Sequence, residues 1–74
     1  MSILTEEKMT FTEHLLYLRK SHGLTQTELA EKIGVSWRGY QNYELGLREP
    51  KISVVIALAD FYNLSLDELV CRRR

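Results

Sequence analysis

The sequence predicts an all-α fold, a single domain of five short helices. Apolar residues recur at the three- and four-residue spacing of amphipathic helices, and nothing alternates with period two for long enough to suggest a sheet. The capping-box spacing, in which Glu follows Ser or Thr after three residues, precedes three apolar stretches, at Thr10, Thr25 and Ser65. A length of 74 residues allows one small domain and no second.

The first two expected helices are separated by a glycine. In the first helix the apolar residues lie at i, i+4 and i+7, and they are Phe11, Leu15 and Leu18. The inner face of the shorter second helix consists of Leu29, Ala30 and Ile33. We expect Gly23 to end the first helix and Gly34 the second, because glycine readily takes the left-handed conformation that follows many helices.

The remaining three helices follow the same rules. Ser36 can cap a third helix over residues 37–45, which Gly46 ends. The fourth helix begins between residues 51 and 53, and its buried stripe consists of Val55, Leu58, Ala59 and Tyr62. The fifth helix is short, and its apolar residues are Leu66, Leu69 and Val70. Residues 1–9 are then an N-terminal arm, residues 10–71 the helical domain and residues 72–74 a cationic tail.

The composition argues against several classes of protein. A single cysteine, Cys71, leaves no internal disulfide and no cysteine-based zinc cluster, and His14 and His22 have no ligating residue at a suitable spacing. We therefore expect no metal and no cofactor. No Ser/His/Asp set and no paired acids mark a catalytic pocket, so we do not expect an enzyme. The longest apolar run, residues 54–59, is too short for a membrane span and no signal pattern opens the chain, so the expected location is the cytoplasm.

The second and third helices are joined by residues 34–36, a three-residue turn that contains a glycine. Two helices joined in this way predict a helix-turn-helix. Ala30 is small where the two helices must approach each other, and Val35 is apolar and can plug the turn. Tyr40 and Tyr43 lie where the third helix faces the core, so core packing is one role open to these rings.

Motifs over residues 11–70 resemble those of the Cro/C1-type (XRE-like) helix-turn-helix proteins of phage repressors and related bacterial regulators. The matching segments are Leu18–Arg19, Gly23–Gln26, Glu28–Ala30, Gly34–Ser36, Tyr43–Gly46, Arg48–Pro50 and Leu58–Leu69. The resemblance implies a lambda-repressor-like DNA-binding domain whose third helix enters the major groove of double-stranded DNA. Two positions depart from the usual pattern: Trp37 stands where many relatives have Gln, and Gly39 has no side chain on the groove side.

The resemblance also implies which residues touch DNA. The positions that meet base edges correspond to Trp37, Arg38, Gln41 and Asn42. Arg is suited to two hydrogen bonds with guanine and Asn to two with adenine. The positions that meet phosphates correspond to Gln26, Arg48 and Lys51, and the hydroxyl of Tyr43 is a further candidate.

Two other sets of residues have structural roles by the same resemblance. Arg19 and Glu44 correspond to an ion pair that ties the first helix to the end of the third. The C-terminal segment holds more apolar residues than one short helix needs, so it serves either the core of the monomer or a homodimer interface. The candidate interface residues are Phe61, Leu64, Leu66 and Leu69.

The function that these features indicate is that of a sequence-specific transcriptional regulator. We expect a repressor that binds an inverted-repeat operator as a homodimer, with half-sites about 34 Å apart. The alternative is a protein-interaction module, such as the antitoxin of a toxin–antitoxin pair or an adaptor. The net charge of zero, from ten basic and ten acidic residues, favours that alternative, because DNA-binding domains are usually basic. Trp37 favours it as well, because a surface aromatic can serve a protein contact. However, residues 19–51 contain six basic and four acidic residues, so the net charge of the whole chain hides a basic middle segment.

Overall fold

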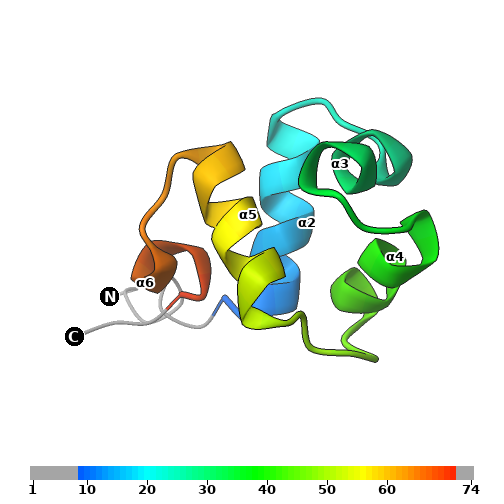
Figure 1. The fold of residues 1–74 in the computed structure, drawn as a ribbon. Helices are drawn as coiled ribbons and strands as arrows, with labels where there is room; N and C mark the ends of the chain where they lie inside the picture. Colours follow the sequence, from blue (N-terminus) through cyan, green and yellow to red (C-terminus); the bar gives the residue numbers. More distant parts are fainter. Residues whose placement is uncertain (1–8, 72–74) are drawn as a thin grey trace.

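The computed structural model describes residues 9–71, and these residues form five helices (Figure 1). They are α2 (Phe11–Ser21), α3 (Gln26–Ile33), α4 (Trp37–Leu45), α5 (Ile52–Tyr62) and α6 (Leu66–Leu69). No strand occurs within residues 9–71, so the predicted all-α fold is confirmed. The expected tail and all of the expected arm except Met9 lie outside the described residues.

Side chains cap the start of four helices. Capping boxes form at Thr10, Thr25 and Ser65, where the hydroxyl accepts a hydrogen bond from the backbone of the following Glu and the Glu carboxylate accepts one from the cap. At the start of α4, the hydroxyl of Ser36 accepts a hydrogen bond from the N–H of Gly39 at 3.0 Å. These bonds satisfy N–H groups that have no partner within the helix. The helix starts predicted from the caps are therefore confirmed.

The helix ends follow the predicted glycines, with two differences. Gly34 and Gly46 take the left-handed conformation directly after α3 and α4, as predicted. The C-cap of α2 is His22, and Gly23 follows it with a φ of 68°. After α5 the left-handed position is taken by Asn63, with a φ of 58°, because Asn tolerates this conformation better than most residues other than glycine.

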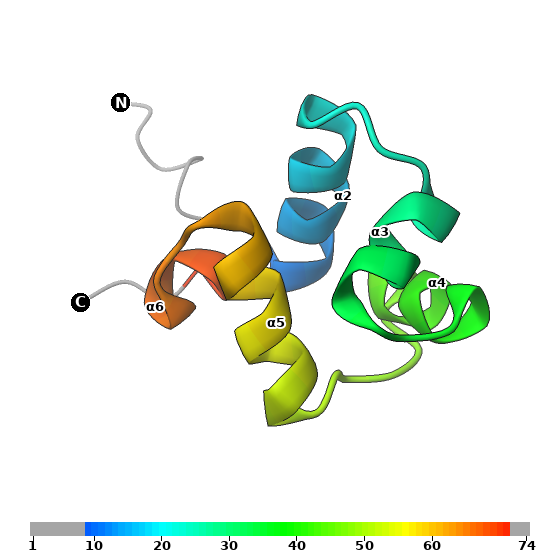
Figure 2. The same ribbon diagram turned by 45° about the horizontal axis from the view of Figure 1, so that its top comes forward.

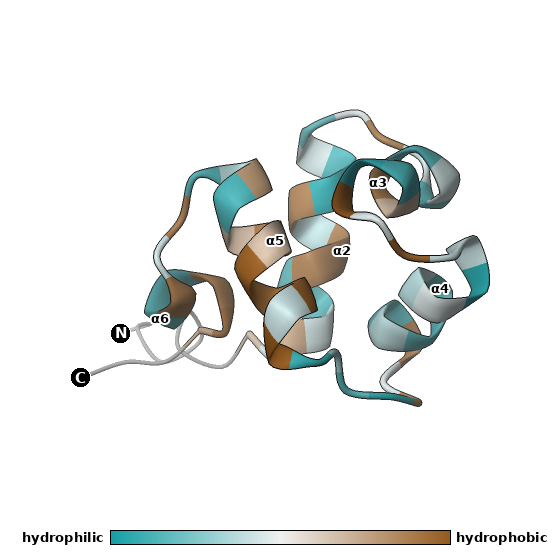
Figure 3. Ribbon diagram, in the orientation of Figure 1, coloured by the Kyte–Doolittle hydropathy of each residue, from teal (hydrophilic) through white to brown (hydrophobic). Residues whose placement is uncertain are grey.

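The core lies among the five helices, with α2 and α5 in the middle of the molecule, α3 and α4 at one end and α6 at the other (Figures 1 and 2). All five helices contribute buried side chains: Leu15, Leu18, Leu29, Ala30, Tyr40, Tyr43, Leu58, Ala59, Tyr62 and Leu69. Figure 3 shows that α5 is the most hydrophobic helix, which fits its position in the middle of the fold.

The short helix α6 is held by contacts with other helices. Leu69 is fully buried, and its carbonyl accepts a hydrogen bond from Nδ1 of His14 in α2 at 2.9 Å. A carbonyl oxygen only accepts, so His14 carries a proton on Nδ1 in this contact. An isolated helix of four residues is not stable in water, so this docking decides that α6 forms.

Candidate nucleic-acid interface

The turn between α3 and α4 has the helix-turn-helix geometry. Gly34 turns the chain with a φ of 78°, and the N–H of Val35 donates to the carbonyl of Ala30 at 3.0 Å. Val35 packs against the core, and Ala30 is almost completely buried. The small Ala30 lets the two helices approach, and the left-handed glycine redirects the chain into α4.

Gly39 has a local reason for its lack of a side chain. A methyl group at this position would lie 3.1 Å from the hydroxyl oxygen of Ser36, closer than an ordinary van der Waals contact. That hydroxyl is the acceptor that caps α4, so glycine here leaves the cap in place.

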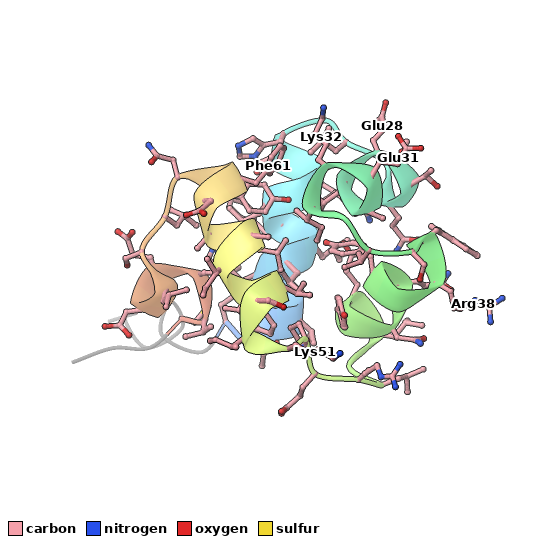
Figure 4. The ribbon with its side chains drawn as sticks, in the orientation of Figure 1. Glu28, Glu31, Lys32, Arg38, Lys51 and Phe61 are labelled. Atoms are coloured by element: carbon pink, nitrogen blue, oxygen red, sulfur yellow. The ribbon has the colours of Figure 1, made fainter. Side chains whose placement is uncertain are left out.

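The face of α4 that points away from the core carries the four residues expected to meet bases. Trp37 is 43% exposed, Arg38 is exposed, and Gln41 and Asn42 are half-buried. They lie at i, i+1, i+4 and i+5, which places them on one side of a helix. Figure 4 shows Arg38 extending from α4 away from the body of the molecule.

The side of α4 that faces α2 and α3 is fixed by the carboxylate of Glu44. Nε of Arg19 donates to it at 2.7 Å and Nη2 at 3.1 Å, so the expected ion pair is present in the structure. The hydroxyl of Tyr40 donates to the same carboxylate at 2.6 Å, and Nε2 of Gln26 donates at 3.0 Å. Nη1 of Arg19 also donates to the carbonyl of Leu24 at 2.9 Å. One carboxylate thus joins α2, α3 and α4.

These contacts change the acidity of the groups involved. Burial by itself raises the pKa of Glu44, but the hydrogen bonds from Arg19, Tyr40 and Gln26 outweigh it and hold the pKa below its ordinary value. Burial and the hydrogen bond to Glu44 raise the pKa of Tyr40 far above its ordinary value. Glu44 is therefore ionised and Tyr40 neutral at physiological pH, which keeps the ion pair and its hydrogen bonds intact.

Gln26 at the start of α3 is linked to α4 through Trp37 as well as Glu44. The indole Nε1–H of Trp37 donates to Oε1 of Gln26 at 3.2 Å. The guanidinium of Arg38 lies over the indole ring, with its Cζ 5.6 Å from the ring centroid. The sequence alone did not predict these contacts. For the Tyr40–Glu44 hydrogen bond, by contrast, a signal was present in the i, i+4 spacing of the two residues along α4.

The expected phosphate contacts divide into two kinds. Arg48 and Lys51 are exposed on the segment between α4 and α5, and Lys51 precedes a helix whose first turn has no side-chain cap. Such a turn offers unpaired N–H groups to an anion. Tyr43 is only 9% exposed and packs edge-to-face on Tyr40, 6.3 Å between ring centroids. The ring of Tyr43 therefore belongs to the core, the alternative that the sequence left open for it.

The expected dimer residues need one correction. Phe61 and Leu64 are half-buried, Leu66 is 42% exposed, and Leu69 is 0% exposed. Leu69 cannot contribute to an interface because its side chain is enclosed by the core of its own chain, so this part of the expectation is wrong.

The apolar side chains with the greatest exposure among residues 9–71 lie elsewhere. They are Leu47 at 73%, Ile52 at 67% and Leu45 at 62%, and they fall within the stretch that ends α4 and begins α5. That stretch also contains Arg48 and Lys51.

No group of three or more His, Cys, Asp or Glu among residues 9–71 is arranged to hold a metal ion. None of the described helices is long and apolar enough to span a membrane.

A family model for helix-turn-helix domains matches residues 15–69. The chain belongs to the Cro/C1-type helix-turn-helix family. This Cro/C1-type domain is 40% identical over 60 residues to the uncharacterized HTH-type transcriptional regulator YqaE of Bacillus subtilis, a match that covers 81% of the chain and 52% of YqaE. It is 36% identical over 64 residues to the cryptic phage CTXphi transcriptional repressor RstR of Vibrio cholerae, a match that covers 86% of the chain and 57% of RstR.

A solved structure agrees with this assignment. The crystal structure of a transcriptional regulator from Listeria innocua matches the Cro/C1-type domain with a TM-score of 0.83 and 38% sequence identity. The match covers 88% of the chain and 61% of that regulator. The chain thus spans about half to three fifths of the proteins that it matches.

Proposed function

We propose that this chain is a sequence-specific DNA-binding repressor that acts in the bacterial cytoplasm and binds an inverted-repeat operator as a homodimer. The observation that carries the proposal is the division of α4 into two faces. Tyr40 and Glu44 hold one face against α2 and α3, and Arg38 and Asn42 stand on the other. A helix held rigidly on one side and polar on the other suits insertion into the major groove. The name of RstR, a transcriptional repressor, favours repression over activation.

In the proposed complex, base contacts and phosphate contacts have separate roles. Arg38 and Asn42 read guanine and adenine, Gln41 adds a further polar contact, and Trp37 touches DNA through apolar surface, because its only hydrogen-bond donor is bonded to Gln26. The phosphate contacts come from Gln26, Arg48 and Lys51. The hydroxyl of Tyr43 is a further candidate, because the ring packs in the core while the residue keeps 9% of its surface exposed.

The homodimer contact that best suits this function is the exposed apolar stretch at Leu45, Leu47 and Ile52, which Ile56, 45% exposed, extends along α5. A two-fold operator requires both copies of α4 to face the same side of the DNA in successive major grooves. Since α4 and α6 lie at opposite ends of the molecule, a contact through α6 would leave the two α4 helices at the far ends of the dimer (Figures 1 and 2). A contact next to α4 would place them closer to the separation of successive major grooves, about 34 Å. It would also cover the most exposed apolar side chains of residues 9–71.

Selection of bound sequences from a random DNA pool is the direct test of the proposed function. The expected result is a palindromic consensus whose half-sites are about one helical turn apart. Binding should weaken steeply between about 50 and 200 mM salt, because phosphate contacts release counterions. An empty selection, with no salt-sensitive binding to any duplex, would refute DNA binding and favour the antitoxin or adaptor alternative.

Variants separate the two kinds of contact. Arg38→Ala should weaken operator binding and relax the preference at one base pair by about 1–3 kcal/mol, whereas Lys51→Ala should weaken binding to all sequences alike. Each dimer loses two Lys51 contacts, so the salt slope should fall by about 2. Lys32→Ala is the charge-matched control, because Lys32 lies on α3 well away from Arg38 (Figure 4). If Arg38→Ala leaves the discrimination between base pairs unchanged at every operator position, the base-reading role assigned to Arg38 is refuted.

The oligomeric state tests the dimer surface. Leu47→Ser should shift the protein toward monomer in sedimentation experiments, and Leu66→Ser should leave the dimer intact. The reverse result would place the interface at α6 instead.

A further inference from the structure

Trp37 contacts two of the residues to which we assign DNA contacts, and it does so within the protein. Its indole N–H is bonded to Oε1 of Gln26 at 3.2 Å, and its ring supports the guanidinium of Arg38 at 5.6 Å. Trp37 is nevertheless 43% exposed and lies at the first residue of α4, outside the hydrophobic core. Its contacts therefore link surface groups of α3 and α4 without filling the interior.

The contacts of Gln26 fix the orientation of its amide. An indole N–H only donates, so the group facing Trp37 has to be the amide oxygen. The ionised Glu44 carboxylate only accepts, so the group facing it has to be the amide nitrogen, at 3.0 Å. A flipped amide would set donor against donor on one side and acceptor against acceptor on the other. The one orientation that satisfies both partners leaves the second N–H of Nε2 available to an external acceptor.

We propose that Trp37 is a positioning residue that couples a phosphate contact to a base contact. Its N–H holds the Gln26 amide with the spare Nε2–H ready for a DNA phosphate, and its ring face holds Arg38 ready for a base edge. This role rests on the proposed DNA binding. Long polar side chains lose rotamer freedom when they bind, so side chains ordered in advance lose less on forming the complex. A cation over an indole within about 6 Å is an attractive contact that provides such ordering for Arg38.

The first half of the test needs no DNA. Trp37 is the only tryptophan, so a nitrogen–proton correlation spectrum contains a single indole signal. Gln26→Ala should move that signal and speed its exchange with water, whereas Thr27→Ala, a neighbouring exposed residue, should leave it unchanged. If the chemical shift and exchange of the indole signal are unchanged in Gln26→Ala, the hydrogen bond between Trp37 and Gln26 is overturned.

The second half is a double-mutant cycle on the selected operator and on a random duplex. Trp37→Phe keeps an aromatic face and removes the N–H, so it should weaken binding to both duplexes alike, by about 3- to 10-fold per half-site. In the Gln26→Ala background the same substitution should have an effect of less than about 2-fold, because the contact that it supports is already gone. If Trp37→Phe weakens binding as much in the Gln26→Ala background as in the unmodified protein, Trp37 does not act by positioning Gln26.

Comparison of Trp37→Phe with Trp37→Leu isolates the role toward Arg38. The Leu variant has no ring face, so discrimination at the base pair read by Arg38 should fall a further 2- to 5-fold, about the contribution of an exposed cation–π contact. Equal base-pair discrimination in Trp37→Phe and Trp37→Leu would overturn the proposed positioning of Arg38 by the indole ring. Thermal unfolding checks that all variants fold. If the unmodified chain binds no duplex while the indole signal still depends on Gln26, DNA binding itself is refuted, and the Trp37 contact is only structural.

Discussion

Replacing Glu44 with Gln should lower the free energy of unfolding by about 3 kcal/mol near neutral pH, at the lower end of the range for breaking a buried ion pair. The carboxylate accepts four hydrogen bonds, two on each oxygen: Nε of Arg19 and the hydroxyl of Tyr40 on Oε2, and Nη2 of Arg19 and Nε2 of Gln26 on Oε1. An amide of the same shape has one oxygen. Whichever way the amide turns, its NH₂ group faces two donors.

The size of this effect follows from burial. The side chains of Arg19 and Glu44 are 12% and 6% exposed, so little water replaces a lost contact. Hydrogen bonds to charged groups contribute about 1.5–3 kcal/mol each, and removal of one partner of a buried ion pair costs about 3–5 kcal/mol. In the Gln variant, Arg19 keeps its hydrogen bond to the carbonyl of Leu24, which favours the lower end of the range of about 3–5 kcal/mol. The free energy of unfolding of a domain of this size is roughly 4–11 kcal/mol. A loss of about 3 kcal/mol should lower the melting temperature by about 12–24 °C.

The pH dependence gives the prediction a second readout. The pKa of Glu44 is depressed in the folded state, so its contribution is complete above the unfolded value of about 4.3 and is lost as the pH falls through the folded value. The Gln variant has no titrating group at this position. The gap between the two proteins should therefore be widest at neutral pH and should narrow below about pH 4.

Urea unfolding of both proteins across this pH range measures the gap. Glu49→Gln is the matched control, because Glu49 is exposed and its loss should change the unfolding free energy by less than about 0.5 kcal/mol. A gap below about 1 kcal/mol at pH 7, or one that stays constant down to acidic pH, would show that the four hydrogen bonds do not hold α4 as described.

Three other perturbations test the fold. Burial raises the pKa of Tyr62 to about 12 and that of Tyr40 further, so the stability that these two rings contribute is complete below about pH 10 and is lost above it. In an absorbance titration, both rings should therefore ionise together with unfolding. Ionisation of all tyrosines near pH 10 in the folded protein would contradict this prediction. Gly34→Ala should cost about 1–2 kcal/mol in urea unfolding, since φ is 78° and no atom obstructs the added methyl, so only backbone strain remains. Leu69→Ala should cost about 2–5 kcal/mol and Leu66→Ala under 1 kcal/mol; similar values would mean that α6 is not docked as the structure describes.

The local elements of this fold could be predicted from the sequence because their signals are local. A capping box needs a hydroxyl and a carboxylate three residues apart, and Thr25 with Glu28 meets that requirement within a single turn. The left-handed turn after α3 favours a residue without a Cβ, and Gly34 supplies it. Such features depend on spacing along the chain, which the sequence shows directly.

The contacts that join the site could not be found in this way. The bond from Trp37 to Gln26 spans 11 positions, and the bond from Arg19 to Glu44 spans 25. Nothing local marks these partners, and the Arg19–Glu44 pair was expected only from the resemblance to a family. Leu69 shows the same limit, because an apolar residue on a four-residue helix could face the core or a partner, and only packing against α2 and α5 decided between them.

The two faces of α4 have a consequence for the evolution of such a protein. Tyr40 and Glu44, which hold the helix, lie on the same short segment as Arg38 and Asn42, the proposed groove contacts. None of the four hydrogen bonds to the Glu44 carboxylate comes from Arg38 or Asn42. Substitutions on the outer face should therefore alter the preferred operator while stability changes by less than about 0.5 kcal/mol. Trp37 is the exception, because exchanging it also releases Gln26. New binding preferences are thus most accessible through Arg38 and Asn42, with the scaffold beneath them left unchanged.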